Sequence, residues 1–366
     1  MQFNLYIFKQ LLRSTLALLF VLVSVIWLFQ TIRLLELIVN RGAGADEFLL
    51  MSVASMPLWL MIAIPISGFI SINWVFSRIL SDRELLVMQS VGLSPLQLAK
   101  APIALGILLS SFLMVNSVYI LPTSFGVYKD LQFKLRNSIP EILLRDGVFI
   151  EIVDGMTMFV GDRDDDEIMR DIFIHDARDA SRTVTMTAET GRFLSETAAP
   201  TLVLQNGERS ERTATGKNGA VLLFETHSLK ITRDETAPTE RVGVDMNEDS
   251  IANLLSRDAE QAASYFPQRH AEGHYRIASP LLALALCLLS SAIILRGQIR
   301  RDLWSRRAIL NISLCVLTII ALVVTRGMTT KNPSLWPLIH FSVLVPGLVG
   351  LWLLKPKLIR ESEVTA

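Results

Sequence analysis

Apolar residues along this chain gather into six long blocks, at about residues 15–39, 48–76, 95–121, 277–295, 308–327 and 335–354. Each block has roughly 20 or more residues with few charges, and a helix of about 20 residues crosses the hydrocarbon core of a membrane. Between the third and fourth blocks lies one long polar stretch. The pattern predicts a polytopic α-helical membrane protein with six transmembrane helices and a single soluble insert.

The polar stretch alternates apolar and polar residues in short runs, which is typical of β-strands. Its clearest signal is the pair of runs 148–153 and 156–160 around Asp154-Gly155, because Asp-Gly supplies the positive φ of a tight hairpin turn. Further runs follow at 171–175, 183–188, 192–195, 201–204 and 220–231, with turn signals at Asn206-Gly207 and Asn218-Gly219. Short strands without helices between them predict an inserted all-β domain, a sandwich or an open, jelly-roll-like fold.

These elements predict three parts of the chain. Residues 1–121 contain the first three transmembrane helices, 122–275 the β domain, and 276–366 the last three helices. A short amphipathic helix from Ser250 to about Ala263 would lead the chain back to the membrane. The first apolar block continues to about Val39 without a small-residue cleavage site, so we expect a retained span rather than a cleaved signal.

Composition supports a membrane protein, since hydrophobic residues make up 51% of the chain and charged residues 19%. Both kinds of charge number 35, but residues 126–275 contain 17 Lys/Arg against 27 Asp/Glu, and the remainder 18 against 8. The insert is therefore acidic and the membrane part is basic. The insert has no cysteine, and Cys287 and Cys315 fall inside apolar blocks, so its fold needs no disulfide.

The basic residues between spans fall mainly on one side: Lys9, Arg13, Arg78, Arg83, Lys100, Arg296, Arg300, Arg301, Arg306, Arg307, Lys355, Lys357 and Arg360. The short loops on the other side contain little beyond Arg41 and Lys331. The positive-inside rule then places both termini in the cytoplasm. Because the insert follows the third span, residues 122–275 face outward, into the periplasm if the chain lies in a bacterial inner membrane.

The sequence lacks two common catalytic and nucleotide-binding motifs. Gly216-Lys217 is followed by Asn218 and preceded by Glu211 where a Walker A motif needs glycine, so the phosphate cradle is absent. There is no Gly-x-Ser-x-Gly sequence. We therefore expect no catalytic residue, no cofactor and no nucleic-acid partner in this chain, which leaves transport, anchoring or assembly.

Two polar clusters could suggest metal binding. The acidic run 162–167 lacks the alternating ligands and central glycine of an EF-hand loop, which favours a solvated loop between strands. His270 and His274 are four residues apart, but the sequence is not His-Glu-x-x-His, and Gly273 disfavours a helix there. We expect no metal site.

The loop after the second span has the features of a short amphipathic helix. Asp82 and Glu84 suit a helix start, Leu85 and Met88, with Val91, make an apolar edge, and Gly92 can end the helix before Ser94-Pro95 opens the next span. One interpretation is an interfacial helix that joins two spans. The other is a coupling helix that docks into a soluble ATPase and transmits force.

This loop resembles the Glu-Leu-x-x-(Met/Leu)-x-x-x-Gly-x-Ser coupling segment of the LptF/LptG (YjgP/YjgQ) permease family of lipopolysaccharide export. Residues 274–281, His-Tyr-Arg-Ile-Ala-Ser-Pro-Leu, resemble the motif with which that family enters its fourth span. The layout of three spans, a periplasmic β domain and three more spans is similar along essentially the whole chain.

The resemblance implies an ABC transporter permease without enzymatic activity of its own. It implies a heterodimer with an LptG-like second permease subunit, a dimeric cytoplasmic LptB-like ATPase and an LptC-like periplasmic bridge that receives lipopolysaccharide. The segment 82–92 would couple to the ATPase through Asp82, Glu84, Leu85, Met88 and Gly92. Residues 122–245 look more like the LptF branch than the LptG branch.

Three cations near the outward ends of spans are candidates for contact with the lipid headgroup. Arg33 and Arg326 lie at depths where charge is costly, and lipid A phosphates match a guanidinium fork; Lys331 is a further candidate. The alternative for Arg33 is a pair with Glu36, three residues along the same helix, or a side chain that extends to the interface.

Two other classes compete with this interpretation. Permeases of the macrolide-export or lipoprotein-release type have four spans with the large domain after the first, which does not match six blocks. A membrane scaffold or sensor could use the β domain to bind a periplasmic protein. Prolines within the spans, at Pro57, Pro65 and Pro346, argue for a packed helix bundle rather than simple anchors.

Overall fold

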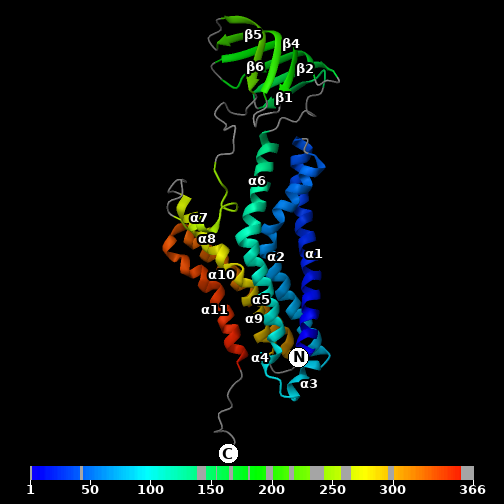
Figure 1. The fold of residues 1–366 in the computed structure, drawn as a ribbon, viewed down its shortest axis with the longest axis vertical. Helices are drawn as coiled ribbons and strands as arrows, with labels where there is room; N and C mark the ends of the chain where they lie inside the picture. The colour runs from blue at the N-terminus through cyan, green and yellow to red at the C-terminus, as the bar shows by residue number, and fades with distance from the viewer. Residues whose placement is uncertain are drawn as a thin grey trace, which may run out of the picture. The chain divides into compact units, whose positions relative to one another are not determined.

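The computed structural model describes residues 2–41, 44–137, 146–153, 155–164, 168–179, 182–194, 201–213, 218–230, 243–256, 265–295 and 301–355. Its helices are α1 Gln2–Arg41, α2 Ala45–Ser81, α3 Glu84–Ser90, α4 Pro95–Leu98, α5 Lys100–Val115, η1 Asn116–Ile120, α6 Leu121–Asn137, α7 Ile251–Leu255, α8 Phe266–Ala278, α9 Leu281–Leu295, α10 Arg301–Lys331, η4 Pro333–Leu335 and α11 Trp336–Leu354 (Figure 1). The chain forms two compact units, Met1–Phe29 with Val53–Val127 and Val244–Ala366, and Gln30–Ser52 with Tyr128–Gly243.

The helices confirm a membrane fold. In the described part of the chain, five stretches are long and apolar enough to cross a membrane: Phe3–Leu34, Ala45–Ser81, Lys100–Leu135, Arg306–Lys331 and Pro333–Leu354. The helices α8 and α9, which are bent by 48° relative to each other, are apolar enough together to make a sixth if the pair forms one span. The third span differs most from its predicted end, because its helix continues past residue 121 to Asn137.

Pro280 explains the bend between α8 and α9. Proline has no N–H, so the carbonyl of Arg276, four residues earlier, loses its helical donor. Ser117 Oγ donates to that carbonyl instead, at 2.9 Å. Its neighbour Asn116 donates from Nδ2 to the carbonyl of Pro57 in α2, also at 2.9 Å. Both donors belong to η1, a π-helical turn, so one irregular turn of the third span connects two other helices.

Two apolar clusters stabilise the membrane unit. The larger joins α1, α2, α3, α5, α9 and α11 through buried residues that include Leu11, Phe76 and Leu105. The second joins α10 and α11 to the start of α9 and to α2, with Leu286 and Ile339 at its centre. Helices α2, α9 and α11 contribute to both clusters, so these three helices connect the two parts of the core.

The insert forms one six-stranded antiparallel sheet in which sequence neighbours pair, in the order β1-β2-β3-β4-β5-β6, and it is strongly curved (Figure 1). The strands are β1 Phe149–Val153, β2 Met156–Arg163, β3 Met169–Asp176, β4 Arg182–Leu194, β5 Thr201–Thr213 and β6 Asn218–Lys230. The predicted β1–β2 hairpin is confirmed, and Gly155 has the expected positive φ of 83°. Residue 154 of the predicted turn lies outside the described residues.

Two strand boundaries were predicted wrongly. The run 183–188 and the described part of the run 192–195, which ends at Leu194, belong to a single strand, β4, and the predicted turn at Asn206-Gly207 lies inside β5. Asn206 has a left-handed φ of 52° within the strand. A Cβ atom on Gly207 would collide with the carbonyl of Thr187 and the ring of Phe224, so the glycine permits close approach of neighbouring strands. Asn206-Gly207, a sequence typical of a turn, thus forms an irregular position within the long strand β5 instead.

One face of the sheet carries a closed apolar core. Alternate residues of β2 are buried, and Met156, Met158, Ile174, Met186 and Leu204 belong to one cluster. This alternation explains why the insert folds without cysteine, since the curved sheet buries its own apolar face.

Candidate functional site

The turn between α2 and α3 is the first part of the predicted coupling segment. Arg78 pairs with Asp82 across one helical turn at 3.8 Å, although both side chains are largely exposed. Arg83 then takes a left-handed φ of 58°, which ends α2 and redirects the chain before Glu84 begins α3. Glu84 is exposed in the first turn of α3, where a carboxylate suits the helix dipole.

The end of α3 is fixed by its backbone. Gly92 has a φ of 86°, and the N–H of Leu93 donates to the carbonyl of Met88 at 3.3 Å, the bond of a Schellman cap. Ser94 and Gln97 then form a reciprocal capping box at the start of α4. Both ends of α3 are thus defined by turns, as the sequence predicted for Gly92.

The two sides of α3 differ in what they contact. Leu85 is 1% exposed and belongs to the large apolar cluster, against which Met88 also packs. Val87 and Val91 are 63% and 77% exposed. The structure therefore separates the residues predicted to couple: Leu85 and Met88 anchor α3 to its own unit, while Glu84, Val87 and Val91 are accessible to another protein.

A second polar site surrounds α8. The guanidinium of Arg276 is buried and donates to two backbone carbonyls, that of Asp249 at 2.7 Å and that of Met246 at 2.5 Å. Arg269, two turns earlier on α8, binds the Asp249 carboxylate at 2.5 Å and the carbonyl of Asn253 at 3.1 Å. Two arginines thus fasten the segment that precedes α7 to the helix that enters the membrane.

Glu272 connects this cluster to α10. Its carboxylate lies 3.4 Å from Nε of Arg276 and 2.5 Å from Nη2 of Arg326. The Arg326 guanidinium also lies 4.6 Å above the ring of Tyr275. Glu272 is 5% exposed and Arg326 44% exposed, so the ion pair joins a buried group to an accessible one.

The other two predicted lipid contacts are placed separately. Arg33 is exposed on α1, in the second unit, and the side chain of Glu36 lies outside the described residues. Lys331 is exposed in the last turn of α10, five residues after Arg326. Arg326 and Lys331 are therefore on one helix end, whereas the structure does not relate Arg33 to them.

The histidines of α8 lie in an aromatic cluster with α11. His274 Nδ1 is 3.2 Å from His340 Nε2, and its ring stacks on Trp336 with centroids 4.4 Å apart. Among the described residues, no group of three or more His, Cys, Asp or Glu side chains is arranged to hold a metal. The expected weakening of the helix at Gly273 was wrong: α8 continues through it, and a Cβ there would lie 2.8 Å from Leu255, so the glycine lets α7 pack closely.

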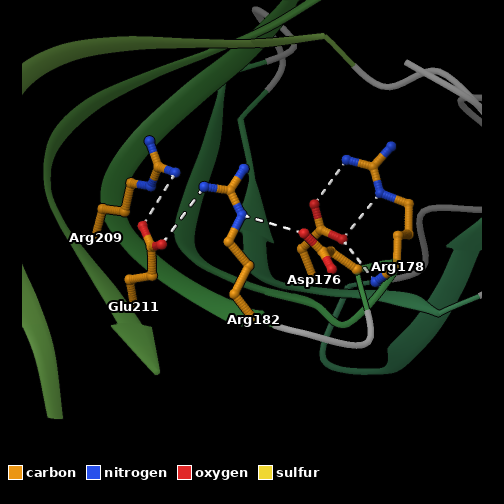
Figure 2. Close-up of polar contacts among 6 residues, drawn as sticks. Asp176, Arg178, Arg182, Arg209 and Glu211 are labelled. Carbon is orange, nitrogen blue, oxygen red and sulfur yellow. Dashed lines mark hydrogen bonds and ion pairs between the residues drawn. The ribbon is translucent and has the colours of Figure 1, made fainter. Parts of the chain in front are cut away.

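A ladder of ion pairs crosses the β-sheet (Figure 2). Arg178 binds Asp176 through two bonds of 2.6 and 2.9 Å, while Arg182 reaches both Asp179 and Glu211 at 3.5 Å. The hydrogen bonds from Arg178 hold the pKa of the Asp176 carboxyl below its ordinary value, because they stabilise its charged form. The Arg182 pairs are exposed and contribute little. The Asp176–Arg178 pair is therefore the part of the ladder that stabilises this end of the sheet.

The sequence analysis missed Asp249, Arg269, Glu272 and Arg276 as functional candidates. A local signal existed, since Glu272 and Arg276 have the spacing of a helical ion pair, just before an apolar block. The expectation of no helix around Gly273 concealed it. The partner of Glu272 on α10 is 54 residues away, and no local pattern could reveal that contact.

Comparisons with known proteins give one consistent family. The model of the family described as lipopolysaccharide export system permease LptF/LptG matches residues 5–356. An uncharacterised protein of Rickettsia prowazekii is 26% identical over 357 residues, which cover 96% of this chain and 98% of that protein. The lipopolysaccharide export system permease protein LptF of Escherichia coli is 22% identical over 246 residues, 66% of this chain and 67% of that protein.

Proposed function

The chain belongs to the LptF/LptG family of lipopolysaccharide export permeases, and on this basis we propose that it is a membrane subunit of an ATP-driven transporter that extracts lipopolysaccharide from the inner membrane. We assign it to the LptF branch, with an LptG-like second permease subunit, a dimeric LptB-like ATPase and an LptC-like bridge as partners. In this proposal both termini are cytoplasmic, and residues 122–275 are periplasmic, between membrane parts 1–121 and 276–366.

The observation that carries the proposal is the construction of α3. A seven-residue helix is too short to be stable in water by itself, yet its C-terminal end is capped and its Leu85 side chain is anchored in the membrane unit. Glu84, Val87 and Val91 remain exposed on a fixed scaffold. Such a face suits docking into a groove of a soluble partner, and its attachment to the spans gives a route for force.

The test is to purify the chain with its partner subunits and follow ATP-dependent release of lipopolysaccharide from vesicles. Glu84→Arg and Val87→Asp should reduce copurification of the ATPase by about tenfold or more, because they alter the exposed docking face. The protein itself should remain folded. Glu208→Arg, on exposed β5, is the matched charge-reversal control.

Leu85→Ala separates anchoring from docking. It removes a buried side chain from the chain's own core, so it should lower the melting temperature as well as coupling. Full ATPase binding and lipid release by Glu84→Arg and Val87→Asp would contradict the coupling role and favour a scaffold.

Arg33, Arg326 and Lys331 are our proposed contacts to the phosphorylated headgroup. All three are accessible cations near the ends of spans, and a guanidinium binds phosphate through two hydrogen bonds. Charge reversal at Arg33 and at Arg326 should reduce lipopolysaccharide crosslinking. Unchanged crosslinking and release in both variants would exclude this role.

For the insert we propose a jelly-roll-like domain that receives the lipid and passes it to the bridge protein. The curved sheet has an apolar face, and its last strand, β6, exposes Val221, Leu222 and Leu223. An edge strand of 13 residues can pair with another sheet. A cysteine at Leu223 should therefore crosslink to a bridge protein in the assembled transporter, and a cysteine at exposed Arg170 in β3, three strands from this edge, should not.

A further inference from the structure

A continuous set of polar contacts joins the accessible end of Arg326 to the backbone of residues 246–249. Arg326 binds one carboxylate oxygen of Glu272, and the other oxygen lies 3.4 Å from Arg276. Arg276 in turn donates to the carbonyls of Met246 and Asp249. Only the first member of this set, Arg326, is substantially exposed.

The chemistry of the set makes Glu272 a shared group. Its single carboxylate neutralises two guanidinium groups, one that is buried and one that is accessible. A buried guanidinium depends strongly on its carboxylate, because water cannot replace it. An accessible guanidinium can exchange a carboxylate for another anion at little cost. An anion that binds Arg326 therefore competes with the Glu272 carboxylate, and Glu272 then interacts more strongly with Arg276.

The segment that Arg276 holds is sensitive to such a change. Residues 244–256 follow the β-sheet in the chain and contain α7, a helix of only five residues. Ser250 caps α7 through its side chain, and Leu254 is buried beside Gly273. So short a helix has little stability of its own, and its order depends on these contacts, on the two carbonyl bonds from Arg276 and on the bonds from Arg269 to Asp249 and Asn253.

We propose that Glu272 is a positioning residue that couples a phosphorylated lipid headgroup at Arg326 to the order of residues 246–255. Phosphate at Arg326 displaces the Glu272 carboxylate, which then pairs with Arg276 alone. The Arg276 guanidinium turns toward it and releases the carbonyls of Met246 and Asp249. Residues 246–255 then loosen when lipid is bound. This inference rests on the proposed headgroup contact of Arg326.

Hydrogen–deuterium exchange on the full-length protein, purified with its partner subunits, tests the coupling. The probes are lipid A with both phosphates and the same lipid with the phosphates removed. We expect the phosphorylated lipid to raise amide exchange in residues 250–255 by about tenfold, which corresponds to ~1.4 kcal/mol of local stability. The phosphate-free lipid should leave exchange unchanged. Binding of each lipid is measured separately.

Variants separate positioning from binding. Glu272→Gln should retain lipid A binding, since Arg326 keeps its charge, but should show no rise of exchange in 250–255 with lipid, because a neutral amide does not draw Arg276 away from the carbonyls of Met246 and Asp249. Arg326→Gln should lose the lipid response because it lacks the guanidinium. Arg326→Lys keeps the charge without the fork, and its response should be weaker than that of the wild type. Glu208→Gln, in exposed β5, is the neutral control for Glu272→Gln.

The outcomes distinguish the two proposals. If lipid A binds the wild type and exchange in 250–255 stays unchanged, the coupling inference is overturned and the transport proposal is unaffected. A normal lipid response in Glu272→Gln also overturns it. If the wild type shows no ATP-dependent release of lipopolysaccharide, the proposed function fails instead. The wild-type comparison of the two lipids needs no variant and remains decisive if a variant does not fold.

Discussion

Inside the membrane unit, three polar side chains form a triangle of hydrogen bonds between α2, α9 and α10. Asn311 donates to Asn73 Oδ1 at 2.7 Å and to Ser290 Oγ at 2.9 Å, and Asn73 donates to Ser290 Oγ at 3.0 Å. Asn311 is buried, and its Oδ1 has no hydrogen-bond partner among the described residues. The stabilisation from the two hydrogen bonds that Asn311 donates is therefore partly cancelled by the cost of burying its unpaired Oδ1.

Asn311→Leu and Asn311→Asp should differ strongly. Leucine removes two bonds together with the unpaired oxygen, so it should cost at most about 1 kcal/mol. Aspartate places an oxygen against Asn73 Oδ1, which can only accept, and adds a charge in a span, which should cost about 3 kcal/mol. Thermal melting of the purified protein measures both. If leucine lowered the melting temperature more than aspartate did, the three hydrogen bonds would contribute more to stability than we infer from their geometry.

The Asp176–Arg178 pair should make the sheet sensitive to acid. Folding lowers the pKa of Asp176 below its ordinary value of 3.8, so the folded sheet binds fewer protons than the unfolded chain. The stabilisation is then present above about pH 4 and is lost as the pH falls through the lowered pKa. Asp176→Asn should reduce amide protection factors in β3 and β4 at pH 7. At pH 2 the variant should resemble the wild type; an equal difference at both pH values would exclude this origin.

At the scale of elements, close helix packing depends on where glycine stands. On α11, a Cβ atom at Gly350 would lie 2.7 Å from the backbone nitrogen of Leu289 in α9. A Cβ at Gly347, one turn earlier, would lie 3.4 Å from Ala285, an ordinary contact. The two glycines thus look alike in sequence, but only Gly350 is required for the approach of α11 to α9.

Gly350→Ala should therefore destabilise the packing of α11 by about 1–3 kcal/mol, because backbone atoms of α9 cannot move aside easily. Gly347→Ala is the matched control, and it should be neutral or slightly stabilising because alanine favours helix. Fluorescence of Trp352, in α11, can follow melting of both variants. Equal melting temperatures for the two would contradict the close approach at Gly350.

At the scale of the whole molecule, the chain contains two units that differ in how they bury their apolar side chains. The membrane unit buries apolar helices against one another, and it also exposes large apolar side chains on α1, α10 and α11, as expected where lipid or a second subunit covers them. The insert is an acidic sheet with its own closed core.

Labelling of single cysteines should establish the orientation. Ser90→Cys in α3 should react with a membrane-impermeant maleimide only after the inner membrane is opened, while Glu208→Cys in β5 should react in cells whose outer membrane alone is permeable. The native Cys287 and Cys315 are buried, so background labelling should be low. The reverse pattern would invert the proposed topology.

The sequence by itself determined which segments are long and apolar enough to cross a membrane, where the β insert lies, and how α3 ends. Those features depend on local properties: the length of an apolar run, the alternation along a strand, and the left-handed φ that Gly92 and Gly155 accept. The shared residues of the coupling segment and the fourth-span motif also indicated the family before the comparisons identified it.

Only the tertiary structure decided which side of α3 is free and which partners the buried charges have. Leu85 is an anchor because other helices happen to cover it, and Glu272 gains Arg326 from a helix far along the chain. Gly273 and the Asn206-Gly207 pair have local signals for breaks or turns, but packing demands from neighbours overrode them. Contacts between distant segments depend on the fold as a whole, and no window of sequence contains them.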